Sequence, residues 1–252
     1  GPSLSLELQQ TTISVATEHA AGRVPVLAGV THPSYFETMS LASHAAQCGA
    51  SAVVLAAPYY FPADQEELLD YLSHIVPELP LPVMLYNMPA MTKLVFEPET
   101  VRELLAWQNC VGVKDSSGDL EYFRRILAVT KVRPDFTVLM GPEERLLEAL
   151  AYGGHGGVNG GANVFPRLFV SLYEAATSGQ PTEALQEQVR RLGRIYSIGS
   201  NPASSVVKAI KCALSICGIC DDRMAQPFKA FTAPERAQVE RIIAGVMPPQ
   251  AV

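Results

Sequence analysis

Short apolar segments alternate with amphipathic segments along most of this chain, and this alternation restricts the fold more than any other feature. The segments between the apolar ones carry apolar residues at helical spacing, as Leu68, Leu72 and Ile75 do. Apolar strands separated by amphipathic helices form a parallel sheet that helices cover. We expect strands at Val24–Val30, Ala52–Ala57, Val83–Tyr86, Val111–Lys114, Phe136–Met140 and Gly157–Gly161.

Six consecutive strand–helix units predict an α/β fold, namely a (β/α)₈ TIM barrel rather than an open doubly wound sheet. No glycine-rich nucleotide fingerprint follows the first strand, which also disfavours the open sheet. A closed barrel has eight strands, so we expect its first two strands to be missing from the chain given. We predict the barrel over residues 1–179 and a C-terminal helical extension over 180–252, with helices at Thr182–Arg194, Ala203–Cys217 and Pro234–Gly245.

The composition predicts a soluble cytoplasmic protein. The 252 residues carry a net charge of −6 and no basic run, which argues against nucleic acid. No apolar stretch approaches the ~20 residues of a membrane span, and no signal peptide opens the chain. The five cysteines predict no disulfide framework. Cys212, Cys217 and Cys220 match part of a ferredoxin spacing, but no fourth ligand is near, so we expect no cluster.

Two residues at strand ends can do chemistry on a carbonyl group. Lys114 ends one predicted strand and Tyr86 ends the strand before it. An amine attacks a ketone to form an imine, and a phenol moves protons. Gly112 shares a strand face with Lys114, so we expect it to leave room for the lysine side chain, whose pKa desolvation lowers.

Less specific interpretations exist for both residues. A strand-end lysine can simply reach solvent, and a core tyrosine can have a bonded hydroxyl group. Their position at the carboxyl ends of neighbouring strands, where barrel active sites lie, favours chemistry. Tyr59 and Tyr60 occupy the same rim one strand earlier, and we expect one ring to pack and the other to reach a proton path.

The glycine-rich stretch 153–163 has two interpretations of equal weight. It permits tight packing of helix against strand, or it lets backbone approach a bound carboxylate or keto group. His155 is interpreted as a turn residue. Glu143 and Glu144 fit a helix N-terminus better than an acid–base pair.

These motifs, taken together and in this order, resemble the dihydrodipicolinate synthase/N-acetylneuraminate lyase family. The matching segments are Tyr86–Pro89, Gly112–Asp119 and Gly156–Asn163, with Pro58–Tyr60 and Ala28–Val30 in support. The resemblance implies that Lys114 forms a Schiff base with pyruvate or another 2-oxo acid and that Tyr86 shuttles protons. It implies a proton-relay role for Tyr60, in some members across a subunit interface, and a backbone carbonyl of Val158 near the keto acid. Asn159, Gly160 and Ala90 are the further substrate-binding residues that we expect.

Two departures from the family pattern bear on the reaction. The Gly-Thr-Thr-Gly-Glu-like loop that grips the pyruvate carboxylate would lie just before Gly1. The lysine-pathway synthases read Tyr-Asn-x-Pro-Ser-Arg-Thr-Gly, whose arginine holds the aldehyde carboxylate, whereas here Met91 stands in its place. A thioether cannot replace a guanidinium fork, so the sequence resembles the lyase and 2-keto-3-deoxy sugar acid aldolase branches more.

We therefore predict a class I carbon–carbon lyase that cleaves a 2-keto-3-deoxy sugar acid to pyruvate and an aldehyde. The alternatives are the synthase itself, which joins pyruvate to aspartate semialdehyde, and a sugar-acid dehydratase. A further alternative is an inactive barrel that binds a 2-oxo acid. The chemistry needs no metal or cofactor, and the resemblance implies a homodimer or homotetramer.

Overall fold

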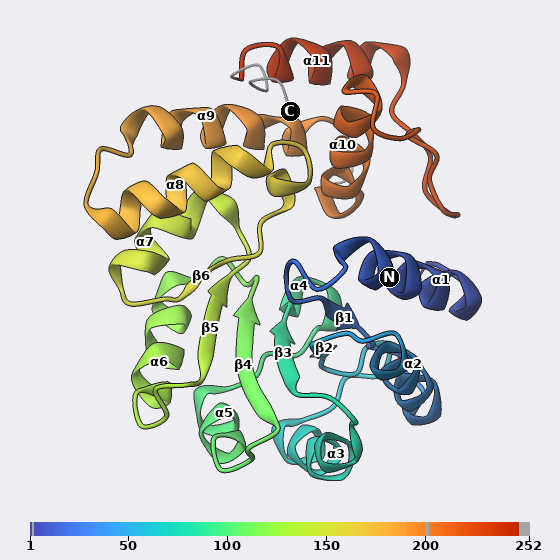
Figure 1. Ribbon diagram of the computed structural model, residues 1–252, viewed down its shortest axis with the longest axis vertical. Helices are drawn as coiled ribbons and strands as arrows, with labels where there is room; N and C mark the ends of the chain where they lie inside the picture. Colours follow the sequence, from blue (N-terminus) through green and yellow to red (C-terminus); the bar gives the residue numbers. More distant parts are fainter. Residues whose placement is uncertain (2, 200–201, 247–252) are drawn as a thin grey trace. The chain divides into compact units, whose positions relative to one another are not determined.

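The computed structural model describes residues 1, 3–199 and 202–246, which form two compact units (Figure 1). The first unit comprises residues 1–139 with 152–155, and the second comprises 140–151 with the chain from 156 onward. Each unit is described by itself below.

The first unit alternates strands and helices as predicted. Its elements are α1 (Leu6–Ala20), β1 (Leu27–Gly29), α2 (Tyr35–Gln47), β2 (Ala52–Ala56), α3 (Gln65–Glu78), β3 (Val83–Asn87), α4 (Pro89–Thr92), α5 (Pro98–Leu104), β4 (Cys110–Asp115), α6 (Leu120–Thr130) and β5 (Thr137–Met140), whose last residue begins the second unit.

The second unit is mainly helical. Its elements are η1 (Glu143–Arg145), α7 (Leu146–Ala151), β6 (Gly156–Gly157), η2 (Gly160–Asn163), α8 (Pro166–Ser178), α9 (Glu183–Gly193), η3 (Arg194–Ser197), α10 (Pro202–Ile216) and α11 (Ala233–Ile243), where η marks a 3₁₀ helix.

The strands follow one another in the order of the sequence, β1 to β6. The pairs β1–β2, β2–β3 and β3–β4 are parallel. In the first unit the sheet is curled, and helices α2, α3, α5 and α6 cover its outer side (Figure 1). This arrangement confirms the α/β class with parallel strands, and the sheet in the described residues has six strands in all.

The helices of the first unit begin where side chains can satisfy their free N–H groups. Asp119 is the N-cap of α6, and its Oδ1 accepts from the N–H groups of Glu121 at 2.9 Å and Tyr122 at 3.1 Å. Asp64 and Glu67 form a capping box at α3. Helix α2 begins at Tyr35, after the N-cap residue Ser34.

Each unit has its own hydrophobic core. The largest fully buried side chains of the first unit come from its helices, its strands and the loops before α5 and β5; they are Leu41, Leu55, Leu68, Leu72, Ile75, Leu85, Phe96, Leu104, Phe123, Ile126 and Phe136. The core of the second unit joins α7 to α11 and includes Leu146, Leu168, Phe169, Leu172, Leu192, Ile195, Cys212 and Val239. Buried apolar area is the main stabilising contribution in both units.

The sixth predicted strand is much shorter than expected. It was predicted over Gly157–Gly161, but β6 contains two residues, and a 3₁₀ turn, η2, begins at Gly160. Glycine has no side chain to pack on a sheet, and Asn159 donates to the Gly141 carbonyl at 2.8 Å, which draws the chain into a loop.

The three helices predicted after residue 180 are present as α9, α10 and α11. The domain boundary that we placed at residue 180 stays a prediction. Positions 200–201 and 247–252 of the predicted extension lie outside the described residues.

Candidate active site

Lys114 and Tyr86 are direct neighbours at the carboxyl ends of two parallel strands. In the β3–β4 register Tyr86 pairs with Lys114, and the lysine Nζ lies 4.4 Å from the centre of the tyrosine ring. The sheet register therefore places an amine over a phenol ring without help from any loop. This is the pair that the sequence predicted.

The environment of Lys114 favours its neutral form. Burial lowers the pKa of its ammonium group below the usual value, because desolvation penalises the charged state. Among the described residues, Lys114 forms no ion pair that would stabilise its charged form and so raise its pKa again. A neutral amine is the nucleophilic form of lysine, so the site is suited to attack on a carbonyl carbon.

Gly112 does not have the role that we predicted from the sequence. We expected it to leave room for the Lys114 side chain, but the space beside its Cα is filled. A Cβ there would lie 2.5 Å from the Thr137 carbonyl oxygen and 2.9 Å from the Met84 Cε. Glycine is required because the β5 backbone approaches β4 closely at this point, directly below the lysine.

A buried polar network that the sequence analysis missed lies beside the pair. Asn87 and Asp115 directly follow Tyr86 and Lys114, and neither side chain is exposed. Asn87 Nδ2 donates to Asp115 Oδ1 at 2.8 Å, and its own Oδ1 accepts from the Phe96 N–H at 3.1 Å. Asp115 also accepts from the Ser117 N–H and hydroxyl, each at 3.0 Å. The network fixes the ends of β3 and β4, and with them Tyr86 and Lys114.

Burial and hydrogen bonding act in opposite directions on Asp115. Desolvation raises the pKa of its carboxyl group, and the bonds from Ser117 and Asn87 partly offset this rise. Every partner of Asp115 is a donor, which is the arrangement that a carboxylate requires. The sequence did contain a signal for this network. A polar residue follows each catalytic candidate at the end of an apolar strand.

Ala90 and Met91 lie on α4, the single helical turn that follows Tyr86 and Asn87. Both are exposed, Met91 by 50%. The Ala90 carbonyl accepts from Lys93 Nζ at 2.8 Å, which ties that ammonium group to the turn. The position where the synthases carry an arginine is thus an accessible thioether in this chain.

Among the described residues, no hydrogen bond or ring contact joins Tyr60 to Lys114 or Tyr86. Its side chain is 82% exposed, and its ring packs edge-on against Phe61, with 5.0 Å between the ring centres. Its φ of +92° is strained for a residue with a side chain. The predicted proton-relay role is therefore not supported by a contact with Tyr86 in the described chain.

The predicted substrate-binding residues Val158, Asn159 and Gly160 belong to the second unit. Val158 is half exposed, and its N–H donates to the Met140 carbonyl at 2.9 Å. Asn159 is nearly buried and bonds to the Gly141 backbone. A Cβ on Gly160 would lie 3.1 Å from both Ile210 and Tyr196. These contacts support the packing interpretation of the glycine-rich stretch for Asn159 and Gly160.

The second unit also contains a buried carboxyl group, that of Glu143. Its Oε2 accepts from the Gly161 N–H at 2.7 Å and from the Tyr196 hydroxyl at 3.2 Å, whereas its Oε1 is buried without a hydrogen-bond partner. Burial raises the pKa of Glu143, and these two bonds partly offset the rise. The side chain joins η1 to η2 and η3, which is a packing role beyond the helix N-terminus that we predicted.

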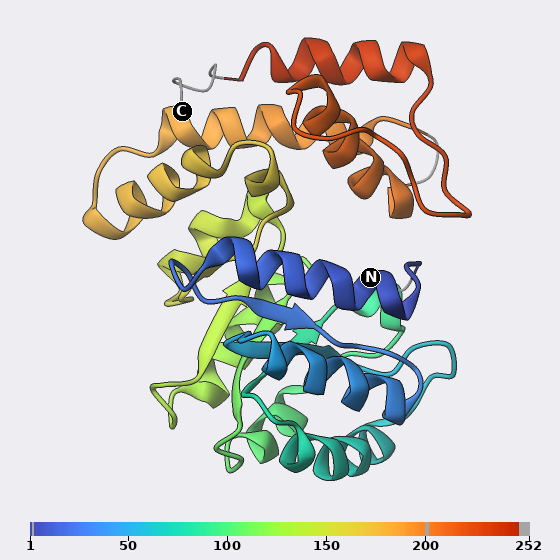
Figure 2. The same cartoon turned by 45° about the vertical axis from the view of Figure 1, so that its right-hand side comes forward.

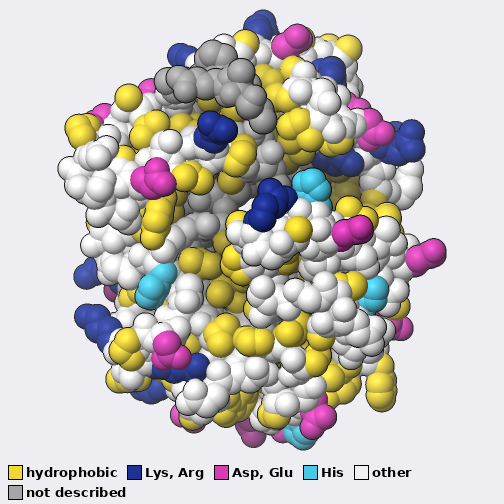
Figure 3. Space-filling view, in the orientation of Figure 1, with side chains coloured by type: hydrophobic (Ala, Val, Ile, Leu, Met, Phe, Trp, Pro, Cys, Tyr) yellow, Lys and Arg dark blue, Asp and Glu magenta, His cyan; other side chains and the backbone are white. Residues whose placement is uncertain are grey.

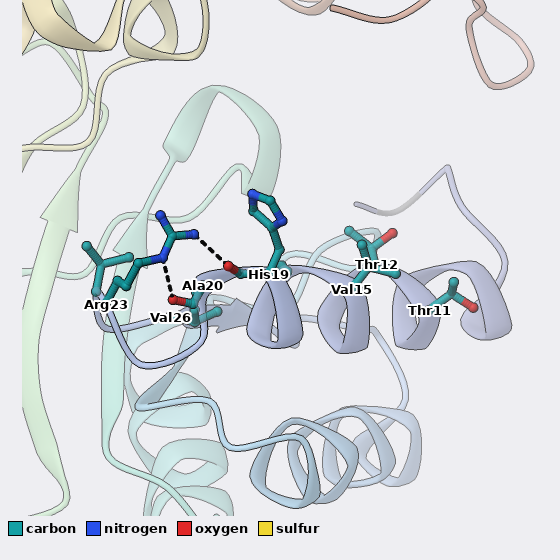
Figure 4. A pocket seen from close by; sticks show the side chains of 9 residues that line it. Thr11, Thr12, Val15, His19, Ala20, Arg23 and Val26 are labelled. Atoms are coloured by element: carbon teal, nitrogen blue, oxygen red, sulfur yellow. Dashed lines mark hydrogen bonds between the residues drawn. The ribbon is translucent and has the colours of Figure 1, made fainter. Parts of the chain in front are cut away.

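A wide apolar hollow of about 720 Å³ lies along α1 and the loop that follows it, at a place distinct from β3 and β4 (Figure 4). Thr12, Val15 and His19 line it, and Arg23 closes one end by donating to the His19 and Ala20 carbonyls. The hollow contains no acid–base pair. It is therefore not the candidate active site.

Charge and metal chemistry give no competing site in the described part of the chain. On the face drawn in Figure 3, basic and acidic side chains are scattered among each other. No group of three or more potential metal ligands is present among the described residues. No helix in these residues has the length and apolar character needed to cross a membrane.

Comparison with known proteins gives a consistent result. Residues 1–245 match the model of the dihydrodipicolinate synthetase family. A solved dihydrodipicolinate synthase of Bacteroides thetaiotaomicron is 43% identical, with a TM-score of 0.90 over 96% of this chain and 82% of that one.

Two Escherichia coli proteins are similar as well. A probable 2-dehydro-3-deoxy-D-pentonate aldolase, YjhH, is 37% identical over 76% of this chain and 65% of its own length. YagE, solved in complex with pyruvate, is 28% identical, with a TM-score of 0.90 over 97% of this chain and 82% of that one. Synthases and aldolases thus both resemble this chain.

Proposed function

Because the chain belongs to the dihydrodipicolinate synthetase family of pyruvate-dependent lyases and aldolases, we propose that it cleaves a 2-keto-3-deoxy sugar acid to pyruvate and an aldehyde. The observation that carries this proposal is the partly desolvated Lys114 amine, 4.4 Å above the Tyr86 ring on the neighbouring strand. The two groups are the amine and the proton carrier that a Schiff-base lyase needs.

Lys114 is the nucleophile in the proposed mechanism. Its Nζ attacks the C2 ketone, and loss of water leaves an iminium ion. Tyr86 gives its proton to the departing water and, now a phenolate, takes the proton of the C4 hydroxyl group. The C3–C4 bond then breaks, its electrons move to the iminium, and the aldehyde leaves. Protonation of the enamine at C3 and hydrolysis release pyruvate and restore the free amine.

A second candidate reaction is condensation of pyruvate with aspartate semialdehyde, as in the dihydrodipicolinate synthases. The 43% identity to the Bacteroides synthase favours it. The exposed thioether of Met91 argues for the sugar acid, because an aldehyde that bears a carboxylate needs a cationic partner and Lys93 is engaged by the Ala90 carbonyl.

The remaining assignments extend the proposal to binding and assembly. We assign the keto-acid contact to the backbone carbonyl of Val158, supported by that residue's exposure, and contacts with the aldehyde half to Ala90. Asn159 and Gly160 shape the loop that carries Val158. The exposed Tyr60 and Phe61 rings support a homodimer or homotetramer in which Tyr60 completes the partner's proton path.

We also propose that the fold is a (β/α)₈ barrel. Parallel strands that follow one another in sequence order support it. Five free cysteines support a reducing compartment such as the cytoplasm.

The test is a comparison of the two reactions under the same conditions. Pyruvate release from 2-keto-3-deoxy sugar acids is measured by its coupled reduction to lactate, and condensation is measured with aspartate semialdehyde and pyruvate. We expect a larger kcat/KM for cleavage. Faster condensation would replace the aldolase assignment by the synthase.

A matched pair of variants tests the role of the phenol. Tyr86→Phe should lower kcat by about 10²–10⁴-fold, the usual contribution of a positioned proton carrier. Tyr173→Phe, which alters a half-exposed tyrosine of α8, should leave kcat unchanged. Equal rates in both variants would remove Tyr86 from the mechanism.

A further inference from the structure

Helices α1 and α2 of the first unit lie side by side (Figure 2). A second cluster of reactive side chains lies between them. Cys48 caps the C-terminus of α2, His44 lies one turn before it, and Ser14 faces both from α1. Cys48 Sγ is 3.4 Å from His44 Nε2 and 3.3 Å from Ser14 Oγ, and Nε2 and Oγ are 2.9 Å apart. Thiol, imidazole and hydroxyl thus form a closed triangle.

This triangle can hold a thiolate. If the thiol proton moves to His44, the Nε2–H group and the Ser14 hydroxyl can both donate to the sulfur anion. While the thiol is neutral, His44 Nε2 accepts from it and the Ser14 hydroxyl donates to the Gln10 carbonyl, which lies 3.1 Å from both Oγ and Nε2. Each protonation state therefore has partners for its polar atoms, and thiolate character makes a cysteine reactive.

The other four cysteines provide the contrast. Burial raises the pKa of Cys110 to about 12, and burial likewise raises the pKa of Cys212 and of Cys217. Cys220 is exposed. Among the described residues, Cys48 is the one thiol that bonds to an imidazole. Cys48 is also only partly buried, so a small reagent can reach it.

We propose that Cys48 is a modification site that small hydroperoxides oxidise to a sulfenic acid, with His44 as the proton donor to the leaving oxygen. The thiolate attacks one peroxide oxygen, an S–O bond forms and the O–O bond breaks. The departing hydroxide takes the imidazolium proton and becomes water. Overall, thiol and hydrogen peroxide give sulfenic acid and water, with sulfur oxidised by two electrons and the peroxide reduced by two.

The position of Cys48 between two helices determines which oxidants can reach it. Partial burial between two helices admits hydrogen peroxide more easily than a bulky disulfide. The C-terminal carbonyl groups of α2 disfavour an anion at Cys48. Reactivity therefore depends on the two donors, and on His44 above all, because it can carry a full positive charge.

Sulfenic acid trapping tests the proposal on the whole protein. The chain is exposed to limiting hydrogen peroxide with dimedone present, cut after glutamate, and analysed by mass spectrometry. Residues 38–66 then carry Cys48 as their only cysteine. We expect the label on Cys48 at least about tenfold faster than on Cys220, the accessible control in the same molecule.

Two variants assign the effect to the cluster. His44→Gln should reduce Cys48 labelling about tenfold, toward the rate of Cys220, and Ser14→Ala should reduce it less. In both variants the buried Cys110 must remain unlabelled, which shows that the fold is intact. Preferential labelling of Cys220, or an unchanged Cys48 rate in a folded His44→Gln variant, would overturn the proposal.

Discussion

Two strand-end regions of this molecule bury a carboxyl group close to glycine-dependent packing, and they do so differently. In the first unit, Asp115 at the end of β4 has a donor for each of its oxygens. In the second unit, Glu143 has donors on one oxygen and none on the other. The first region is a closed polar network that leaves Lys114 and Tyr86 free for chemistry. In the second region, Glu143 links packed helical segments, and its Oε1 has no hydrogen-bond partner.

The same contrast holds for the glycines of the two regions. A Cβ on Gly112 would meet the Thr137 carbonyl, a backbone atom, at 2.5 Å. A Cβ on Gly161 would meet side-chain atoms of Phe169, Leu192 and Glu143 at 2.7–2.9 Å. Backbone in a sheet cannot move aside as the end of a side chain can. We therefore expect an added side chain to be tolerated less well at Gly112 than at Gly161.

The largest effect is expected from alanine at these glycines. Gly112→Ala must push β4 away from β5 and should cost about 3 kcal/mol or more of unfolding free energy, while Gly161→Ala should cost about 1–2 kcal/mol. Gly29→Ala, where a Cβ has nothing within 4 Å, is the neutral control. Denaturant unfolding measures all three. A smaller loss of unfolding free energy at position 112 than at position 161 would contradict the difference that we describe between the two regions.

Amide substitutions at the two carboxyl groups should have the next largest effects. Asp115→Asn places an NH₂ group opposite the Ser117 hydroxyl, which must then accept instead of donate, removes the charge from the network and should cost about 1–3 kcal/mol of unfolding free energy. Glu143→Gln can place its NH₂ at the unpaired oxygen and should change stability by less than about 1 kcal/mol. Asp115→Asn should also lower kcat, because the network positions Lys114. Equal losses of stability in the two variants would contradict the assignment of the two roles.

The smallest effect is expected from removing the partly buried Lys114 amine. Burial lowers the pKa of Lys114, so the unfolded chain binds a proton that the folded chain has released between the lowered pKa and 10.5. Stability contributed by this group therefore rises with pH through that window. Lys114→Met should slightly raise Tm near neutral pH, and its advantage should shrink as the pH approaches 10.5.

The control for this variant is Lys131→Met, which alters an exposed lysine. It should show no such change with pH, as measured by thermal unfolding across the same range. A Lys114→Met advantage that does not depend on pH would assign the gain to packing rather than to the charge.

Much of the first region could be predicted from the sequence, because periodicity and register are local properties. The apolar strands that end in Tyr86 and Lys114 follow one another, and parallel pairing then makes these residues neighbours. The Asn87–Asp115 bonds could not be predicted, since they depend on the rotamers of two side chains. Gly112 was predicted to make room for Lys114, but it makes room for the β5 backbone. The sequence does not show how closely β5 approaches β4.

The second region was less predictable for a physical reason. Glycine has no side chain whose spacing could distinguish a strand from a loop. The sequence therefore did not predict where the short β6 ends and the turn η2 begins. The contact between Glu143 and Tyr196 joins residues far apart in the chain and follows no periodicity. The helices α9 to α11, with their strong apolar faces, were predicted.

The most direct test of the account is to trap the imine. The protein is incubated with pyruvate, reduced with borohydride and analysed by intact and peptide mass. We predict one pyruvate adduct per chain on the peptide that contains Lys114, and none in the Lys114→Ala variant. An adduct on another lysine, or none from folded wild-type protein, would contradict the assignment of Lys114 as the Schiff-base residue.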